Sequence, residues 1–195
     1  MDIAGWISAA ANVAIALGLS LTWFQIRADH DRSRRERAVE FILGWARNLD
    51  RRGTAARKLV EKLPFEQAKA LFQQEAFEID AKHHDHVESV FLELPPVEGQ
   101  KFQIDVKLSA ELRWLTVTYL NNLEAVIAAW RHKVADERII AEQFRYLVSP
   151  VDNQFILERF RQAANGDTNY PAIAQFVRKL RSAEGHAPSK RWWVP

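Results

Sequence analysis

The pattern of apolar and polar positions begins with a long stretch that carries no charge. The 24 residues from Ile3 to Ile26 contain no Asp, Glu, Lys or Arg, and Asp2 and Arg27 lie on either side. As a helix the stretch would be about 36 Å long, and the hydrocarbon core of a bilayer is about 30 Å thick. The pattern therefore predicts one transmembrane helix over residues 1–27, in preference to a buried core helix or a cleaved signal peptide.

Aromatic and basic residues flank this stretch as they flank membrane spans. Trp6 and Trp23 lie near its ends, where indole rings meet lipid headgroups, and arginines are frequent after it. By the positive-inside rule we expect a protein of the bacterial inner membrane, with its N-terminus outside and its C-terminal domain in the cytoplasm. The residues expected at the membrane interface are Trp6, Trp23, Arg27, Lys190, Arg191, Trp192 and Trp193.

Small and polar residues recur within the charge-free stretch at helical spacing. One stripe contains Ser8, Asn12, Ala16 and Ser20, and a second contains Ala10, Ala14 and Gly18 on the opposite side of the helix. Small residues let membrane helices approach closely, and an Asn can form a hydrogen bond across the contact. The first stripe therefore predicts self-association. The alternative is that Ala is only a good apolar helix former and that Asn12 is tolerated.

The chain beyond Arg27 has the three- and four-residue apolar spacing of amphipathic helices. The first helix is expected to continue without a break to about residue 49, until Gly53 interrupts it. Its apolar face is made of Val39, Ile42, Ala46 and Leu49 and is widened by Phe41 and Trp45. The fold class is all-α: a single N-terminal transmembrane helix that continues into a cytoplasmic helical bundle. Further helices are expected at 54–63, 65–80, 110–133 (with Ser109 as N-cap), 136–148, 151–164 and 172–183.

One segment alternates polar and apolar residues with the period of a strand. In "KFQIDVKL", residues 101–108, the apolar positions are Phe102, Ile104, Val106 and Leu108. A single strand has no partner to pair with, so we expect an extended loop here. The preceding "ELPPVEGQ" has the Pro and Gly residues of a turn.

Composition narrows the possible partners and compartments. The formal net charge is +2, but residues 1–62 carry +4, residues 63–111 carry −6 and residues 112–195 carry +4. The acidic middle third would repel phosphate, so we expect no nucleic-acid partner. Cys is absent, which excludes disulfides and thiolate metal sites. We divide the chain into a transmembrane helix (1–27), a cytoplasmic α-helical domain (28–187) and a basic, aromatic tail (188–195), which either touches lipid or covers the bundle.

The candidate chemistry is sparse. The only cluster that resembles a metal site is "HHDHVE", residues 83–88, in which His84 and Glu88 would share a helix face. No third ligand from a distant segment can be named, and the sequence contains no nucleophile elbow and no Gly-rich phosphate loop. We therefore expect no catalysis, no cofactor and no functional metal site, and the cluster is interpreted as a solvated helix or loop.

One stretch of the chain is similar to a known family. "TYLNNLEAVIAAWRHKVADERIIAEQF", within residues 112–147, resembles an uncharacterised bacterial family of membrane-anchored helical proteins that is known only as a domain of unknown function. The resemblance implies one N-terminal membrane helix, a basic helical continuation and a helical cytoplasmic domain. It implies no reaction and no ligand.

These observations favour a membrane-held module that acts by contact. We expect a single-pass protein that binds membrane lipid and forms a homo-oligomer. Its helical module would act as a scaffold or sensor that binds an unidentified protein partner. The alternative from another class is an effector that perturbs the membrane in a stress or phage-defence response. A third hypothesis is a membrane-tethered, metal-dependent enzyme that uses His83–Glu88.

Overall fold

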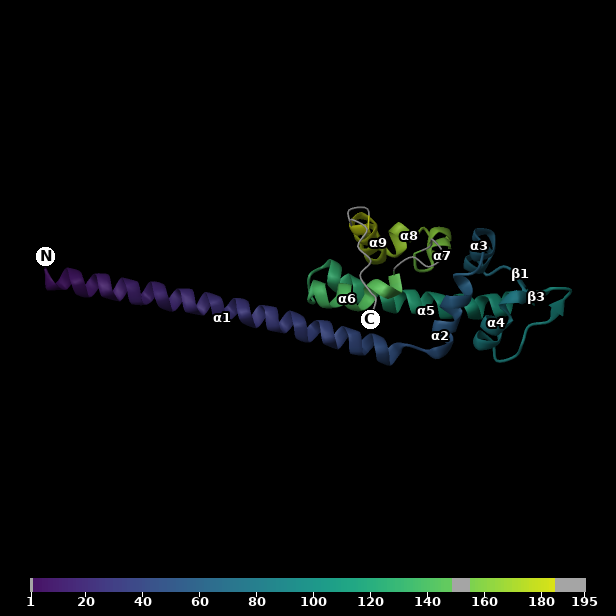
Figure 1. Cartoon of the computed structure of the whole chain (residues 1–195), viewed down its shortest axis with the longest axis horizontal. Helices are drawn as coiled ribbons and strands as arrows, with labels where there is room; N and C mark the ends of the chain where they lie inside the picture. The colour runs from purple at the N-terminus through teal and green to yellow at the C-terminus, as the bar shows by residue number, and fades with distance from the viewer. Residues whose placement is uncertain (1, 149–154, 185–195) are drawn as a thin grey trace, which may run out of the picture.

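The protein consists of a long N-terminal helix and a compact helical part, here called the body, which contains the end of that helix from residue 34 and the described residues up to 184. The computed structural model describes residues 2–148 and 155–184, apart from the side chains of residues 4, 5, 8–10, 166, 167, 183 and 184. Helix α1 (Ile3–Asn48) has 46 residues without a break, as the sequence predicts. Its N-terminal end lies far from the rest of the chain, and only its C-terminal part runs along the body (Figure 1).

The long helix does not meet the requirements of a membrane span on the described residues. Among the residues whose side chains the structure describes, no helix combines the length and the apolar character that are needed to cross a bilayer.

The central element of the body is α5 (Val106–Arg131). Helices α2 (Arg51–Val60), α3 (Phe65–Gln73), α6 (Glu137–Val148) and α9 (Pro171–Glu184) pack against it, together with the end of α1. Buried apolar residues occur on several sides of α5, among them Leu112, Leu120, Leu123 and Ile127. This wide apolar surface is what places α5 at the centre, because each neighbouring helix buries one stripe against it. The helical bundle predicted from the sequence is confirmed.

The break after α1 lies earlier than the sequence predicts. The helix ends at Asn48, and Gly53 is a buried residue inside α2 rather than the interruption. Asp50 begins α2, because its side chain accepts a hydrogen bond from the backbone N–H of Arg52 at 3.2 Å. An N-capping Asp is therefore the residue that separates the two helices.

A small antiparallel sheet is the main departure from the predicted all-α fold. It has the order β1–β3–β2, with β1 at Phe77–Asp80, β2 at Val97–Glu98 and β3 at Lys101–Ile104. The first half of the alternating segment is thus a strand and its second half begins α5, so the prediction of an extended loop is wrong. The sequence pattern predicts a helix over residues 65–80, which include the partner strand β1, so it does not indicate the pairing of Ile79 with Phe102.

The helix before β1 ends at a residue with left-handed backbone. Gln74 has φ 59° and caps α3, and the backbone N–H of Glu75 donates to the carbonyl of Ala70 at 2.9 Å. This closure is the usual way in which a helix stops before a strand. Because Gln is unusual at positive φ, the composition of the segment did not indicate the end.

The start of α5 also differs from the prediction. The N-cap is Asp105, whose carboxylate accepts from the backbone N–H of Leu108 at 2.8 Å. Ser109, the predicted cap, is a buried residue within the helix. The strand β3 is the physical reason, because the chain leaves the sheet at Ile104 and turns at once into the helix.

One of the C-terminal helices is shorter than the pattern predicts. Of the helix expected over residues 151–164, only α7 (Glu158–Ala163) is present among the described residues, and residues 151–154 lie outside them. The short helix α8 (Gly166–Asn169) lies between α7 and α9 in the chain, and α9 begins with Pro171, a residue suited to the first helical position. Near the sheet, α4 (His84–Val90) follows a short 3₁₀ helix, η1 (Ala81–His83).

Candidate functional site

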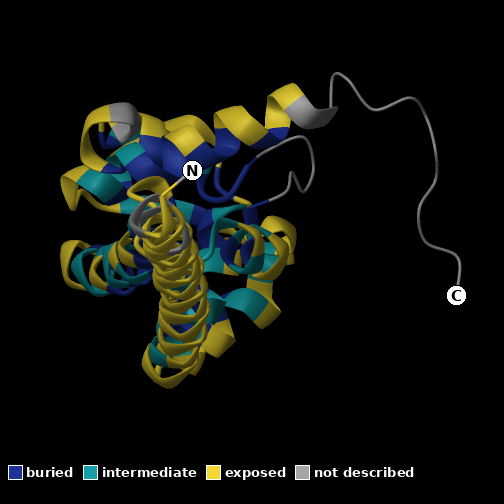
Figure 2. Cartoon of the chain, turned by 90° about the vertical axis from the view of Figure 1, so that its left-hand side faces the viewer, coloured by how far each residue is buried: buried dark blue, intermediate teal, exposed yellow. Residues whose placement is uncertain are grey.

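The part of α1 that precedes the body, residues 3–33, is here called the arm. Every described side chain in the arm is exposed, and the first residue of α1 that the body partly buries is Arg34. Seen from the end of α1, the arm is exposed over its whole surface, whereas the body behind it has a buried interior (Figure 2). Nothing in the described chain covers the arm.

The surface of the arm is apolar over much of its circumference. Val13, Ile15, Leu17, Leu19 and Leu21 are each 59–67% exposed, and Phe24 is 62% exposed. At about 100° of rotation per residue, these side chains form two broad faces on opposite sides of the helix. The surfaces between them carry Ala, Gly, Ser, Thr and Gln but no charge. A helix of this kind needs an apolar environment on more than one side.

The predicted association stripe lies on the open surface of the arm. Asn12, Ala16 and Ser20 are exposed, and the side chain of Ser8 lies outside the described residues. The Ser20 hydroxyl donates to the carbonyl of Ala16 at 2.8 Å, which satisfies this hydroxyl within its own helix. A Cβ added at Gly18 would meet no atom within 4 Å. The stripe is therefore accessible to another helix, and self-association stays a prediction.

The predicted interface residues are found on the arm as far as they are described. Trp6 is 63% exposed and Trp23 is 55% exposed. The guanidinium of Arg27 lies 5.6 Å from the centre of the Trp23 ring, which brings a cation and an indole together after the apolar segment. Lys190, Arg191, Trp192 and Trp193 lie outside the described residues.

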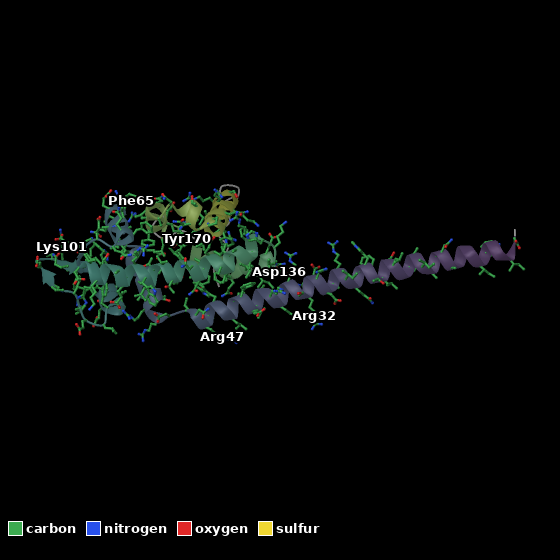
Figure 3. The ribbon with its side chains drawn as sticks, turned by 180° about the vertical axis from the view of Figure 1, so that it is seen from behind. Arg32, Arg47, Phe65, Lys101, Asp136 and Tyr170 are labelled. Carbon is green, nitrogen blue, oxygen red and sulfur yellow. The ribbon has the colours of Figure 1, made fainter. Side chains whose placement is uncertain are left out.

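The arm is joined to the body through the loop before α6. The backbone N–H of Asp136 donates to the carbonyl of Arg34 at 3.0 Å, and Arg34 Nη2 lies 3.9 Å from a carboxylate oxygen of Glu137. Arg35 Nε lies 3.8 Å from Asp136 Oδ2. Figure 3 shows Asp136 beside α1, between the positions of Arg32 and Arg47. Arg34 and Arg35, two of the arginines that follow the charge-free stretch, therefore also contact the body.

The side chain of Asp136 also caps the start of α6. Its Oδ1 accepts from the backbone N–H groups of Arg138 and Ile139 at 2.9 and 3.2 Å, as expected of an acidic residue at the start of a helix. The same side chain thus begins α6 and faces Arg35 on α1. One side chain therefore contacts the start of α6 and a residue of α1.

Toward the end of α1, the contact between this helix and the body is made by apolar packing. Ala38 is fully buried and Trp45 is 9% exposed. The Trp45 ring meets Tyr119 of α5 and Phe144 of α6 edge to face, with centroids 5.2 and 5.6 Å apart. Such pairs add to the free energy gained from burial. The junction therefore connects three helices around one indole.

The face predicted to bury this part of α1 is right for Phe41, Ile42 and Trp45 and wrong for the other three positions. Val39, Ala46 and Leu49 of the predicted stripe are exposed, and Ile42 is partly buried. The buried or partly buried positions are Arg34, Ala38, Phe41, Ile42, Gly44 and Trp45. Sequence reasoning missed Ala38 because a small residue gives a weak hydrophobic signal, although close helix packing needs one at such a position.

The histidine cluster does not assemble a metal site within the described chain. His84 Nδ1 lies 3.9 Å from Glu88 Oε2 and 3.7 Å from Asp85 Oδ1, which are surface contacts on α4. Desolvation by burial lowers the pKa of His83 below its ordinary value, with the nearby charge of Lys82 as a further cause. Among the described residues, no group of three or more His, Asp or Glu side chains could hold a metal ion.

Comparison with known proteins gives one match. A family model described as "Domain of unknown function (DUF4760)" matches residues 12–180, which include most of the arm and nearly all of the described body. No curated protein and no solved structure matches the chain.

Proposed function

Because the chain belongs to the family described as a domain of unknown function, DUF4760, no activity comes with its membership. We propose that the protein is a membrane-held helical module that acts by protein–protein contact and self-association. In this proposal the charge-free segment of the arm crosses the bacterial inner membrane, and the described body, residues 34–148 and 155–184, presents a contact surface next to the bilayer. No catalytic step is part of the proposal.

The exposure of large apolar side chains along the arm is the observation that carries this proposal. A protein gains free energy of about 25 cal/mol for each Å² of apolar surface removed from water, and the arm leaves side chains such as Leu19 and Phe24 exposed. Lipid chains would cover both apolar faces at once. The proposed membrane span is the whole charge-free stretch from Ile3 to Ile26, which includes five positions whose side chains are not described.

The residues after this stretch support the orientation. Residues 27–37 contain five arginines and three acidic residues, so a basic segment follows the apolar one. Arg32 and Arg35 have side chains that are 79% and 68% exposed. Exposed cations close to a bilayer interact with anionic headgroups. The body would then lie on the cytoplasmic side, with about one to two helical turns between the apolar segment and Arg34.

A flotation experiment tests insertion into the membrane. The full-length protein is reconstituted with phospholipid vesicles, washed with alkaline carbonate and floated on a sucrose gradient. We expect it to float with the vesicles. Leu17→Arg together with Leu19→Arg should move most of the protein to the bottom fraction, because arginines at the centre of a span cost about 2.5–3.5 kcal/mol each.

The matched control places arginine on the same helix outside the arm. Leu43 is 49% exposed on the part of α1 that packs on the body. Leu43→Arg should therefore leave flotation unchanged. If the protein remains in the supernatant and behaves as an oligomer without lipid, a second copy rather than a bilayer covers the arm, and the membrane part of the proposal is wrong.

A second candidate function uses the same arm. Small residues on two opposite stripes, such as Ala16 and Gly18, would allow contact with two neighbours, as an effector that assembles and perturbs the membrane requires. Induced expression distinguishes the two functions. Rapid loss of membrane potential would favour the effector, whereas an unchanged potential and unchanged growth would favour the scaffold.

A further inference from the structure

The end of the body that lies beside the arm carries a short basic segment, here called the basic loop. It consists of the last residue of α5 and the three residues after it, which are all exposed: Arg131, His132, Lys133 and Val134. Figure 1 shows that α5 runs from the sheet toward the end of the body at which the arm begins. The basic loop is therefore on the side of the body that faces the arm.

The basic loop lies at the level at which the arm meets the body. Two residues after it, the backbone N–H of Asp136 donates to the carbonyl of Arg34 at 3.0 Å. Figure 3 shows Asp136 at the end of the body from which the arm leaves. Residues 131–134 and the first residues of the body are thus neighbours in space, although about a hundred residues separate them in the chain.

This level is close to the end of the proposed membrane span. Arg34 follows Ile26 by eight residues, which is about 12 Å along a helix. The headgroup layer extends about 5–8 Å beyond the hydrocarbon core. The potential of an anionic surface decays over about 8 Å of solution at physiological ionic strength. If the arm crosses a bilayer, the basic loop therefore lies within reach of the headgroups and their potential.

The cations of the basic loop are available, because the acidic side chains beside it have other partners. The nearby ion pairs are Asp136 with Arg35 at 3.8 Å and Glu137 with Lys179 at 3.9 Å. Within the part of the chain that the structure describes, the side chains of Arg131 and Lys133 form no hydrogen bond and no ion pair. These two charges are left for a partner outside the chain.

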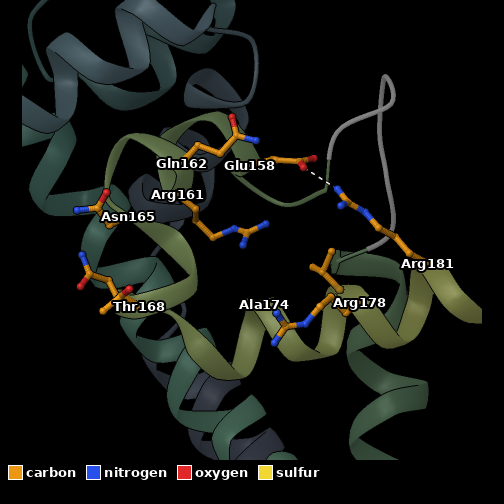
Figure 4. Close-up of a pocket in the computed structure, with 10 residues that line it drawn as sticks. Glu158, Arg161, Gln162, Asn165, Thr168, Ala174, Arg178 and Arg181 are labelled. Carbon is orange, nitrogen blue, oxygen red and sulfur yellow. Dashed lines mark hydrogen bonds and ion pairs between the residues drawn. The ribbon is translucent and has the colours of Figure 1, made fainter.

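The arginines between α7 and α9 differ in this respect. Figure 4 shows Arg181 bound to Glu158, with Nη2 2.6 Å from Oε1. Arg161 is 6% exposed, and its Nε donates to the carbonyl of Ile156 at 2.9 Å. Pairing and burial commit these two cations to the fold, whereas the side chains of the basic loop are exposed and uncommitted.

Lys133 has a backbone conformation that lysine rarely adopts. Its φ is 57°, and its N–H donates to the carbonyl of Trp130 at 3.1 Å where α5 ends. The N–H of Val134 donates to the carbonyl of Ala129 at 3.0 Å. Glycine is the usual residue at such a helix end, because it has no Cβ to strain. The fold alone would favour glycine here, so the lysine points to a role for its charge.

We propose that the basic loop binds the headgroups of anionic phospholipids and thereby holds the body against the bilayer. This inference rests on the proposed function, because the arm must cross the membrane for the loop to reach it. The lipid phosphates would contact Arg131 and Lys133, since guanidinium and ammonium groups form charge-assisted hydrogen bonds with phosphate. Val134, which is 44% exposed, would lie among the headgroups. The partner of this surface is the cytoplasmic leaflet itself.

A fluorescent label in the loop tests the contact. The chain has no Cys, so Val134→Cys carries one environment-sensitive fluorophore at a known position. The labelled full-length protein is reconstituted into vesicles of phosphatidylcholine, with or without phosphatidylglycerol. We expect a blue shift and a rise in emission only when phosphatidylglycerol is present. High salt should reverse both changes, because salt screens the attraction.

Removal of the two cations should abolish this response. Each is worth about a factor of five near an anionic surface, so Arg131→Gln with Lys133→Gln should shift the docking equilibrium about 30-fold toward the free body. Both side chains are exposed, and circular dichroism would verify that the variant folds. The matched control removes two exposed cations of α2, beyond the far end of α1, by Arg51→Gln with Lys58→Gln. It should keep the full spectral shift.

Flotation of the same samples separates this inference from the proposed function. If the protein floats but the label responds equally to neutral and anionic vesicles, the inference is overturned and the membrane span stands. An unchanged shift in the loop variant would mean that Arg131 and Lys133 serve only the negative end of α5, which also overturns it. Equal losses in the loop variant and the α2 control would indicate nonspecific attraction and reject it. A protein that does not float overturns both proposals.

Discussion

The carboxylate of Glu124 in α5 caps the N-terminus of α9, where it meets Ile173, 49 residues further along the chain. Glu124 Oε2 accepts from the backbone N–H of Ile173 at 2.9 Å, and Oε1 accepts from that of Ala172 at 2.7 Å. Helix α9 begins with Pro171 after Tyr170, a residue whose side chain is not a usual N-cap. The acidic residue of the "LNNLE" segment thus supplies from α5 the cap that α9 lacks locally.

Replacement of Glu124 should therefore destabilise the body. Glu124→Gln keeps only one acceptor oxygen and loses the charge that favours a helix N-terminus, so we expect a loss of about 1 kcal/mol in the free energy of unfolding. Glu124→Ala should cost about 1–2 kcal/mol. Urea denaturation measures both. Glu142→Gln on the surface of α6 is the control and should change the free energy by less than about 0.5 kcal/mol.

The junction between the arm and the body should be sensitive to volume. Ala38 is fully buried there, so Ala38→Leu would force α1 away from the body at a cost of about 1–3 kcal/mol. Val39→Leu adds volume on the neighbouring position, which is 49% exposed, and should be nearly neutral. Urea denaturation monitored by circular dichroism would show the difference, and equal stability of the two variants would contradict this view of the junction.

Alkaline pH should weaken the packing around Tyr119. Desolvation by burial raises the pKa of this phenol from 10.0 to about 12. The folded state therefore holds its proton more tightly than the unfolded state, so the stability is fully present below pH 10 and is lost as the pH rises toward 12. We expect a loss of about 1 kcal/mol at pH 11 relative to pH 8. Tyr119→Phe should reduce that loss when both proteins are unfolded with urea.

Mild acid should also lower the stability, through protonation of His83. Burial lowers the pKa of this imidazole below 6.5, so the unfolded state binds the proton more readily than the folded state. The stability is full above pH 6.5 and falls as the pH decreases through that value. His83→Gln should flatten the dependence between pH 7.5 and pH 5.5. Parallel stability curves for the variant and the parent would show that His83 does not contribute.

The C-cap of α3 should accept glycine with a gain in stability. Gln74 is exposed and has φ 59°, a conformation that Gly adopts without steric cost. Gln74→Gly should raise the free energy of unfolding by about 1 kcal/mol. The adjacent Gln73→Gly is the control of opposite sign, because Gly within a helix costs about 0.5–1 kcal/mol. Thermal unfolding of the two variants should therefore diverge.

The sequence determined the features that depend on local spacing. The charge-free stretch, the unbroken helix through Asn48 and the amphipathic helices α5, α6 and α9 follow from apolar periodicity, because a helical stripe is visible within a few turns. The similarity of the central segment to its family was also visible in the residues. Each of these features needs only neighbours in the chain.

Only the tertiary structure decided which distant residues meet. Strand β3 has a partner because α3 stops at Gln74, and Glu124 caps α9 because α5 brings it there. The burial of Ala38 depends on the packing of α1 against the body, and the ion pair of Glu158 with Arg181 depends on where α7 lies relative to α9. Contacts between segments far apart in the chain leave no periodic trace in either segment, so neither pattern alone could indicate them.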